Sequence, residues 1–202
     1  MVMGTAGLLA AGRFARSSPV DLTIEQRELL DRIDAFQFDA SGASLSFPRR
    51  LARENDWTHE TAHRAIREYR RFLFLAMQAG HPVTPSDQVD QVWHLHLCYT
   101  RSYWTRLCGE VLGAPLHHEP TQGGATEGEK FDDWYARTVE SYRRFFGEPP
   151  ADLWPPASTR FGEDLHFRRV NVRRAWVVPK PAALLRAALS GVAFAFAFTF
   201  LH

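Results

Sequence analysis

The chain has 202 residues, and its 24 Lys and Arg side chains nearly balance its 23 Asp and Glu side chains, which leaves a formal net charge of +1 at pH 7. A chain of this length can bury a hydrophobic core without help from disulfides or structural metal ions. Its balanced charge creates no overall field that would attract a polyanion, so we expect no nucleic-acid partner.

The N-terminal part of the chain, residues 1–20, is expected to be flexible. A short apolar stretch there precedes Arg13 and Arg16, which is the reverse of the order in a secretory signal peptide. Thr23 and Gln26 then have the spacing of a capping box. This pair predicts the start of the first helix.

Three further helices are predicted in the middle of the chain. Pro48 suits the first turn of a short helix, and Thr58 has the chemistry of an N-cap for a longer helix that ends at Gly80. Ser86 can cap a fourth helix, which is predicted to continue without interruption until Gly113.

Both cysteines, Cys98 and Cys108, fall within that fourth predicted helix. Ten residues of helix separate them by about 15 Å along the axis, whereas the Cα atoms of a disulfide lie within about 7 Å of each other. We therefore expect two free thiols, as in a protein from a reducing compartment.

A glycine-rich loop separates the fourth helix from a fifth, which Thr126 and Glu129 would open as a second capping box. Only the short segment around Trp176 alternates in the way of a strand, and it contains a proline. The pattern predicts an all-α fold. We expect a compact single-domain helical bundle over residues 21–160, with a further apolar helix at the C-terminus.

The C-terminal part of the chain differs from the rest in composition. Residues 161–181 are rich in arginine, and residues 182–201 form an apolar stretch close to the ~20 residues that span a bilayer. We predict a transmembrane tail anchor at 182–201, a basic juxtamembrane segment at 161–181, and a protein on the cytoplasmic face of a membrane. The alternative is a buried C-terminal helix and a cytoplasmic protein.

The segment VDQVWHLH, residues 89–96, is the most informative motif because it places an acid, an indole and two imidazoles within two helical turns. Successive helical residues rotate by about 100°, so His94 and His96 point in roughly opposite directions and cannot share one metal ion. His96 falls on the apolar face, which predicts a core imidazole bonded to a hydroxyl or carbonyl group. Trp93 and Tyr103 are predicted to line or support the site.

A candidate metal site combines the polar face of this helix with the loop that follows it. Asp90 and His94 are neighbours on a helix surface, and the loop adds the adjacent pair His117 and His118. One carboxylate and two imidazoles would leave open positions on a divalent ion, zinc or iron, as in catalytic sites. Glu119 is a weaker candidate for a general base that acts through a bound water. The alternative is a solvated pair of Asp90 and His94 without metal.

These motifs resemble those of the glycine-rich-domain-containing-protein-like family, bacterial and plant proteins marked by a VDxxWHxH helix. The resemblance extends from about Phe47 to Pro156 and includes PSDQVDQVWHLHLCY, LGAPLHHEPTQGG and YARTVESYRRFFGEPPADLW. It implies that residues 21–160 form one helical glycine-rich-protein-like domain in which the two histidine motifs belong together, and it implies little about activity. The chain lacks the long glycine-rich C-terminal region of the plant members, so it resembles a bacterial, membrane-associated member. The family pattern highlights Asp90, Trp93, His94, His96, Tyr103, His117, His118, Pro120, Tyr142, Phe146, Pro149 and Trp154.

Two functions are compatible with these patterns. The first is a membrane-associated helical interaction or scaffold module, in which the Trp and His cluster fixes helix packing and an unidentified protein partner binds the surface. The alternative is a small metal-dependent enzyme, such as a hydrolase, that uses Asp90, His94 and a loop histidine. Burial distinguishes them, because a metal site needs an accessible His94 with a loop histidine in reach, whereas a core network has its polar groups satisfied by tyrosines and carbonyls.

Overall fold

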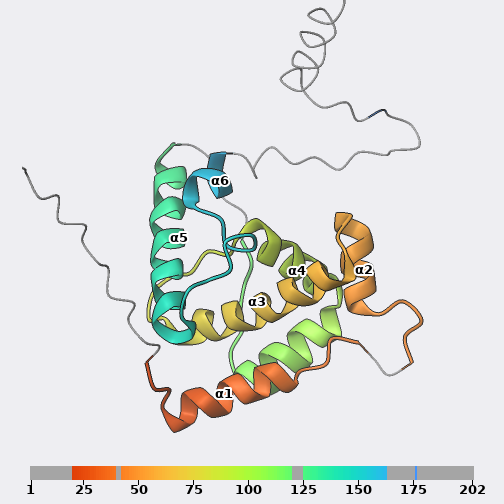
Figure 1. The fold of residues 1–202 in the computed structure, drawn as a ribbon. Helices are drawn as coiled ribbons and strands as arrows, with labels where there is room; N and C mark the ends of the chain where they lie inside the picture. Colours follow the sequence, from red (N-terminus) through yellow and green to blue (C-terminus); the bar gives the residue numbers. More distant parts are fainter. Residues whose placement is uncertain (1–19, 40–41, 120–124, 163–175, 177–202) are drawn as a thin grey trace, which may run out of the picture. The chain divides into compact units, whose positions relative to one another are not determined.

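The computed structural model of the protein describes residues 20–39, 42–119, 125–162 and residue 176, and within these ranges it contains seven helices and no strand (Figure 1). The predicted all-α fold is therefore confirmed for the described part of the chain. The helices are α1 (Ile24–Ala35), α2 (Phe47–Asn55), α3 (His59–Gln78), α4 (Asp87–Cys98), η1 (Arg101–Leu112), α5 (Ala125–Phe146) and α6 (Ala157–Gly162).

Helix α3 is the centre of the fold, and it packs against α1, α2, α4 and α5 (Figure 1). Its sequence explains this position, because the run from Phe72 to Leu75 places buried apolar side chains all around the helix rather than on a single stripe. The outer helices have narrower apolar faces, as α1 has with Leu29 and Ile33. Each outer helix can therefore bury one face against α3 and leave the other in water.

The starts of three helices follow the capping chemistry predicted from the sequence. Thr23 and Gln26 form a reciprocal capping box at the start of α1, with N···O distances of 3.1 and 3.2 Å. Thr58 accepts from the backbone N–H of Thr61, and Ser86 accepts from that of Val89. These bonds satisfy N–H groups that a helix leaves without internal partners.

The predicted continuous helix after Ser86 is wrong, since the chain breaks at Tyr99 into α4 and the π-helix η1. Tyr99 has φ −90° and ψ 60°, and its N–H bonds to the carbonyl of His96, which tightens the last turn of α4. The redirected chain brings the side chains of Ser102 and Tyr103 back onto α4. Cys98 and Cys108 lie on different helices as free thiols, so their predicted spacing along one axis does not apply.

A buried carboxylate, that of Glu68, joins α3 to α5 and to the turn that follows α5. One of its oxygens accepts from the hydroxyl of Tyr142 at 2.7 Å and from the indole N–H of Trp154 at 3.0 Å. The other lies 3.1 Å from the guanidinium of Arg71, which also donates to the Tyr142 hydroxyl. Every oxygen of this buried charge therefore has a donor, as a charge in a protein interior requires.

Several predictions concern the two ends of the chain. The expected flexible N-terminus, most of the basic segment 161–181 and the apolar helix at 182–201 lie outside the described residues. The contacts divide the chain into Met1–Leu165, which holds all seven helices, and His166–His202, of which only Trp176 is described. In the described ranges, the helices are all too short or too polar to cross a bilayer.

Candidate metal centre

Asp90 and His94 occupy adjacent turns of α4, Asp90 in its first turn. Their side chains differ in exposure, with 15% for Asp90 and 49% for His94. The buried residues of the same helix include Val89, Val92 and Trp93. The amphipathic pattern of the helix thus places the carboxylate at the edge of the core and the imidazole in solvent.

His118, in the loop after η1, completes the cluster. Its Nε2 lies 2.8 Å from Oδ1 of Asp90, and Nε2 of His94 lies 3.9 Å from Oδ2 of the same carboxylate. One ligand atom from each of the three residues falls within 4.8 Å of the others. Zinc ligands sit about 2.0–2.2 Å from the ion, so small side-chain rotations would close these three around one metal.

Trp93 and Tyr103 support the loop that carries His118. The ring of His118 lies edge-on to that of Trp93, with centroids 4.4 Å apart. The indole N–H of Trp93 donates to the hydroxyl of Tyr103 at 2.8 Å, and that hydroxyl donates to the carbonyl of Leu116. Burial raises the pKa of Tyr103, so its proton stays in place for the bond to the loop. The break at Tyr99 makes this arrangement possible.

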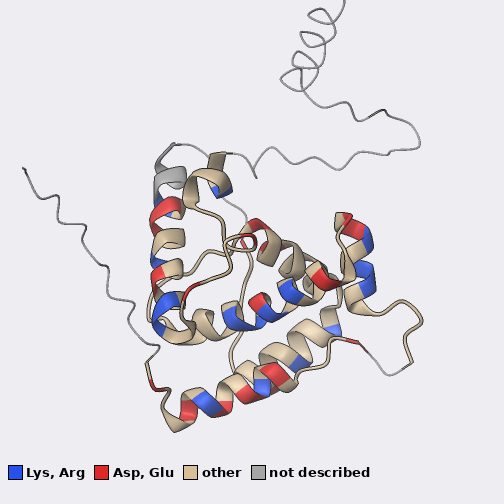
Figure 2. Cartoon of the chain, in the orientation of Figure 1, with Lys and Arg blue, Asp and Glu red and all other residues tan. Residues whose placement is uncertain are grey.

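Arg160, in α6, is a member of the site that the sequence did not indicate. Its Nε donates to the carbonyl of Pro85 at 3.2 Å, and its terminal nitrogens lie 3.8 Å from Asp90 and 4.0 Å from Asp87. Figure 2 shows the acidic residues at the start of α4 and the basic residue on α6. The guanidinium offsets part of the negative charge that a metal ion would meet, and it lies near the same Asp90 oxygen, Oδ2, that His94 faces.

His117 and Glu119 are not brought into the described ligand set. The exposed ring of His117 packs beside Trp104, with centroids 5.4 Å apart, although it is adjacent in sequence to His118. Glu119 is exposed at the end of the described part of the loop. The structure thus selects His118 from the predicted pair and leaves the role of Glu119 as a prediction.

His96 lies in the core, away from the cluster. Its two ring nitrogens each lie 3.2 Å from a hydroxyl group, that of Tyr69 at Nδ1 and that of Ser102 at Nε2. Ser102 gives its single hydroxyl proton to the carbonyl of Phe38, so Nε2 of His96 must donate, and in the neutral ring Nδ1 accepts from the Tyr69 hydroxyl. Both ring nitrogens are thus bonded within the core, which suits a packing role.

Burial, with a smaller effect from the charge of Arg106, lowers the pKa of His96 from 6.5 to about 3. Between these values the unfolded chain binds a proton that the folded chain does not, so stability falls as the pH drops through this window. One pKa unit corresponds to about 1.4 kcal/mol. Between pH 7 and pH 4.5 we expect the native chain to lose roughly 2–3 kcal/mol more stability than His96→Gln, measured by urea denaturation. Equal losses in the two proteins would contradict this assignment.

The fold and the cluster together define a class of protein, a helical domain with one carboxylate and two imidazoles gathered where α4 meets the following loop. A family model described as UCP032817-like matches residues 30–133, just over half of the chain, so the chain belongs to this family. Its description names no activity. Neither a curated protein nor a solved structure matches the chain significantly.

The family match corrects the resemblance drawn from the sequence. The chain belongs to the UCP032817-like family and not to the glycine-rich-domain-containing-protein-like family. The VDxxWHxH motif suggested the wrong family because part of it is a pattern of buried packing residues. Val89, Trp93 and His96 are buried, and a helix that buries these residue types can arise in the cores of different families.

Proposed function

We propose that this protein binds a divalent transition metal ion, zinc or iron(II), through Asp90, His94 and His118. The observation that carries the proposal is the approach of these three ligand atoms to within 4.8 Å of one another. Two histidines and one carboxylate are a ligand set that both metals use in enzymes, and that set leaves coordination positions open. The exposure of His94 leaves those positions accessible to a small molecule.

The chemistry that such a site supports best is hydrolysis, so we propose a small metal-dependent enzyme. A bound metal would supply a Lewis acid that makes water a better nucleophile at neutral pH. Asp90 would neutralise part of the ion's charge, while Trp93 shields one side of His118 from solvent. Glu119, one residue beyond His118, is our candidate for the group that accepts a proton from the water.

The metal-free alternative is a hydrogen-bonded cluster in which His118 donates to Asp90. That arrangement accounts for the 2.8 Å contact, and the i,i+4 register of α4 by itself brings His94 to 3.9 Å from the same carboxylate. The interaction-module hypothesis placed the whole Trp and His cluster in the core. His96 and Trp93 are there, whereas His94 is exposed, and this exposure favours the metal site.

Zinc titration of two matched aspartate variants tests the proposal. Asp90→Asn keeps the shape of the side chain but removes a charged ligand, and we expect zinc affinity to fall at least about 10-fold. Asp87→Asn changes the neighbouring carboxylate, which also faces Arg160, and we expect a change of less than about threefold. Competition with a coloured chelator measures both, and anaerobic iron(II) titration distinguishes the metals. Equal affinities in the two variants would refute the proposal.

A further inference from the structure

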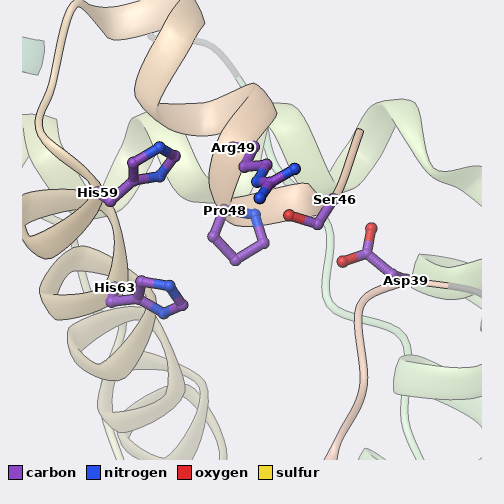
Figure 3. A pocket seen from close by; sticks show the side chains of 6 residues that line it. All are labelled: Asp39, Ser46, Pro48, Arg49, His59 and His63. Carbon is purple, nitrogen blue, oxygen red and sulfur yellow. The ribbon is translucent and has the colours of Figure 1, made fainter. Parts of the chain in front are cut away.

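A second group of polar and titratable side chains surrounds an open hollow between α2 and the start of α3 (Figure 3). The hollow has a volume of about 370 Å³. None of its residues belongs to the cluster on α4. Its walls are formed by Asp39, Ser46, Pro48, Arg49, His59 and His63.

The two histidines of this hollow are placed by the register of α3. The helix begins at His59, directly after the Thr58 cap, and residues four apart lie on the same face with Cβ atoms about 5–6 Å apart. His59 and His63 therefore stand one turn apart, both exposed and both facing the hollow (Figure 3). The sequence there, HETAH, has the HExxH form in which two helical histidines hold zinc.

The acidic residues near this pair decide what kind of site it can be. Glu60, the acid of the HExxH pattern, does not line the hollow, so the residue that serves as general base in metallopeptidases is not aimed at it. Both carboxylate oxygens of Asp39 accept from the backbone N–H of Phe47, at 2.7 and 2.8 Å, and so hold the start of α2. The protein therefore offers two imidazoles here and no peptidase centre.

The opposite wall of the hollow offers hydrogen-bond donors. Figure 3 shows Arg49 and Ser46 across the hollow from the histidine rings. The Ser46 side chain makes no capping bond to α2, although the residue occupies the N-cap position. A guanidinium and a hydroxyl group that face the open positions of a metal ion can donate to an oxyanion bound to that ion.

We propose that His59 and His63 form a second metal site, which binds a zinc-class divalent ion and presents its open positions to an anionic ligand held by Arg49. Two imidazoles suit zinc, nickel and copper ions rather than magnesium or calcium. The site shares no residue with the Asp90 cluster and goes beyond the function proposed for it. With two protein ligands it binds metal more weakly than a three-ligand site and exchanges it readily.

Zinc stoichiometry of the full chain, measured by equilibrium dialysis and elemental mass spectrometry at pH 7.5, tests this proposal. We expect two equivalents for the native chain at saturation and one fewer for His59→Gln/His63→Gln. Either single substitution should weaken the second site at least about 10-fold, because a chelate then loses one of its two ligands. Both side chains are exposed, so the melting temperature serves as a control and should not move. An unchanged stoichiometry in the double variant would overturn the proposal.

A complementary variant distinguishes the contributions of the two proposed metal sites to zinc binding. Asp90→Asn/His94→Gln removes ligands of the first site only, and we expect it to retain the equivalent that depends on His59 and His63. Loss of all zinc in that variant would overturn the second site. If His59→Gln/His63→Gln loses zinc and Asp90→Asn/His94→Gln binds as much zinc as the native chain, the second site is supported and the first is contradicted.

Inorganic phosphate is the probe for the anionic ligand. We expect phosphate to tighten zinc binding at the second site about threefold or more in the native chain, since the metal and Arg49 would share the anion. Arg49→Gln should keep the zinc and lose the effect of phosphate. An equal effect of phosphate in both proteins would remove Arg49 from the proposal.

Discussion

Replacing Glu68 with alanine is expected to lower the free energy of unfolding by about 3–5 kcal/mol. The substitution removes the acceptor of the Tyr142 hydroxyl and the Trp154 indole N–H, and it removes the charge that balances Arg71. The Tyr142 hydroxyl and the Trp154 indole then lose their acceptor in the core, where unsatisfied polar groups are costly, and Arg71 keeps only its contact with the Tyr142 hydroxyl. Urea denaturation followed by circular dichroism measures the difference.

The matched control is an ion pair of good geometry at the surface. Arg64 and Asp152 make two parallel contacts of 2.6 and 2.7 Å, but Asp152 is 57% exposed. We expect Asp152→Ala to cost less than about 1 kcal/mol, because water screens the pair and replaces its bonds. Similar losses in the two variants would contradict the structural role of Glu68.

The adjacent loop histidines provide the second large expected effect. His118→Ala should weaken zinc binding about 100-fold, because one of three protein ligands is lost, whereas second-shell changes alone cost about 10–100-fold. His117→Ala should leave the affinity within about threefold, since His117 packs on Trp104 and lies outside the ligand set. Chelator competition with each purified variant measures both affinities.

The two variants control for each other, because both remove an imidazole from the same loop. An equal loss of affinity would mean that the loop as a whole, and not the ligand atom of His118, supports zinc. An unchanged affinity in His118→Ala would remove this residue from the site.

The parts of the fold that the sequence predicts correctly are those controlled by near neighbours in the chain. Thr23, Thr58 and Ser86 cap helices through bonds to residues three positions away, and such bonds can be inferred from spacing alone. The rotation per residue likewise separates His94 from His96, and the structure places one in solvent and the other in the core.

The features that the sequence could not predict depend on tertiary contacts. Nothing near Tyr99 indicates a helix break, because the break is stabilised by the bonds of Ser102 and Tyr103 to distant parts of the fold. Arg160 approaches Asp90 from 70 positions away, and Glu68 meets Trp154 across 86 positions. Which of His117 and His118 approaches Asp90 also depends on a tertiary contact, that between the rings of His118 and Trp93. The spacing of the HETAH motif can be read from the sequence, but only the structure shows that His59 and His63 line the same hollow.

Anomalous X-ray diffraction at the zinc edge from zinc-soaked crystals would show whether Asp90, His94 and His118 hold one metal ion. We expect an anomalous peak with all three ligand atoms about 2.0–2.2 Å from it, and loss of that peak in His118→Ala. A native crystal with no peak there, in which Nε2 of His118 remains bonded to Asp90, would contradict the claim.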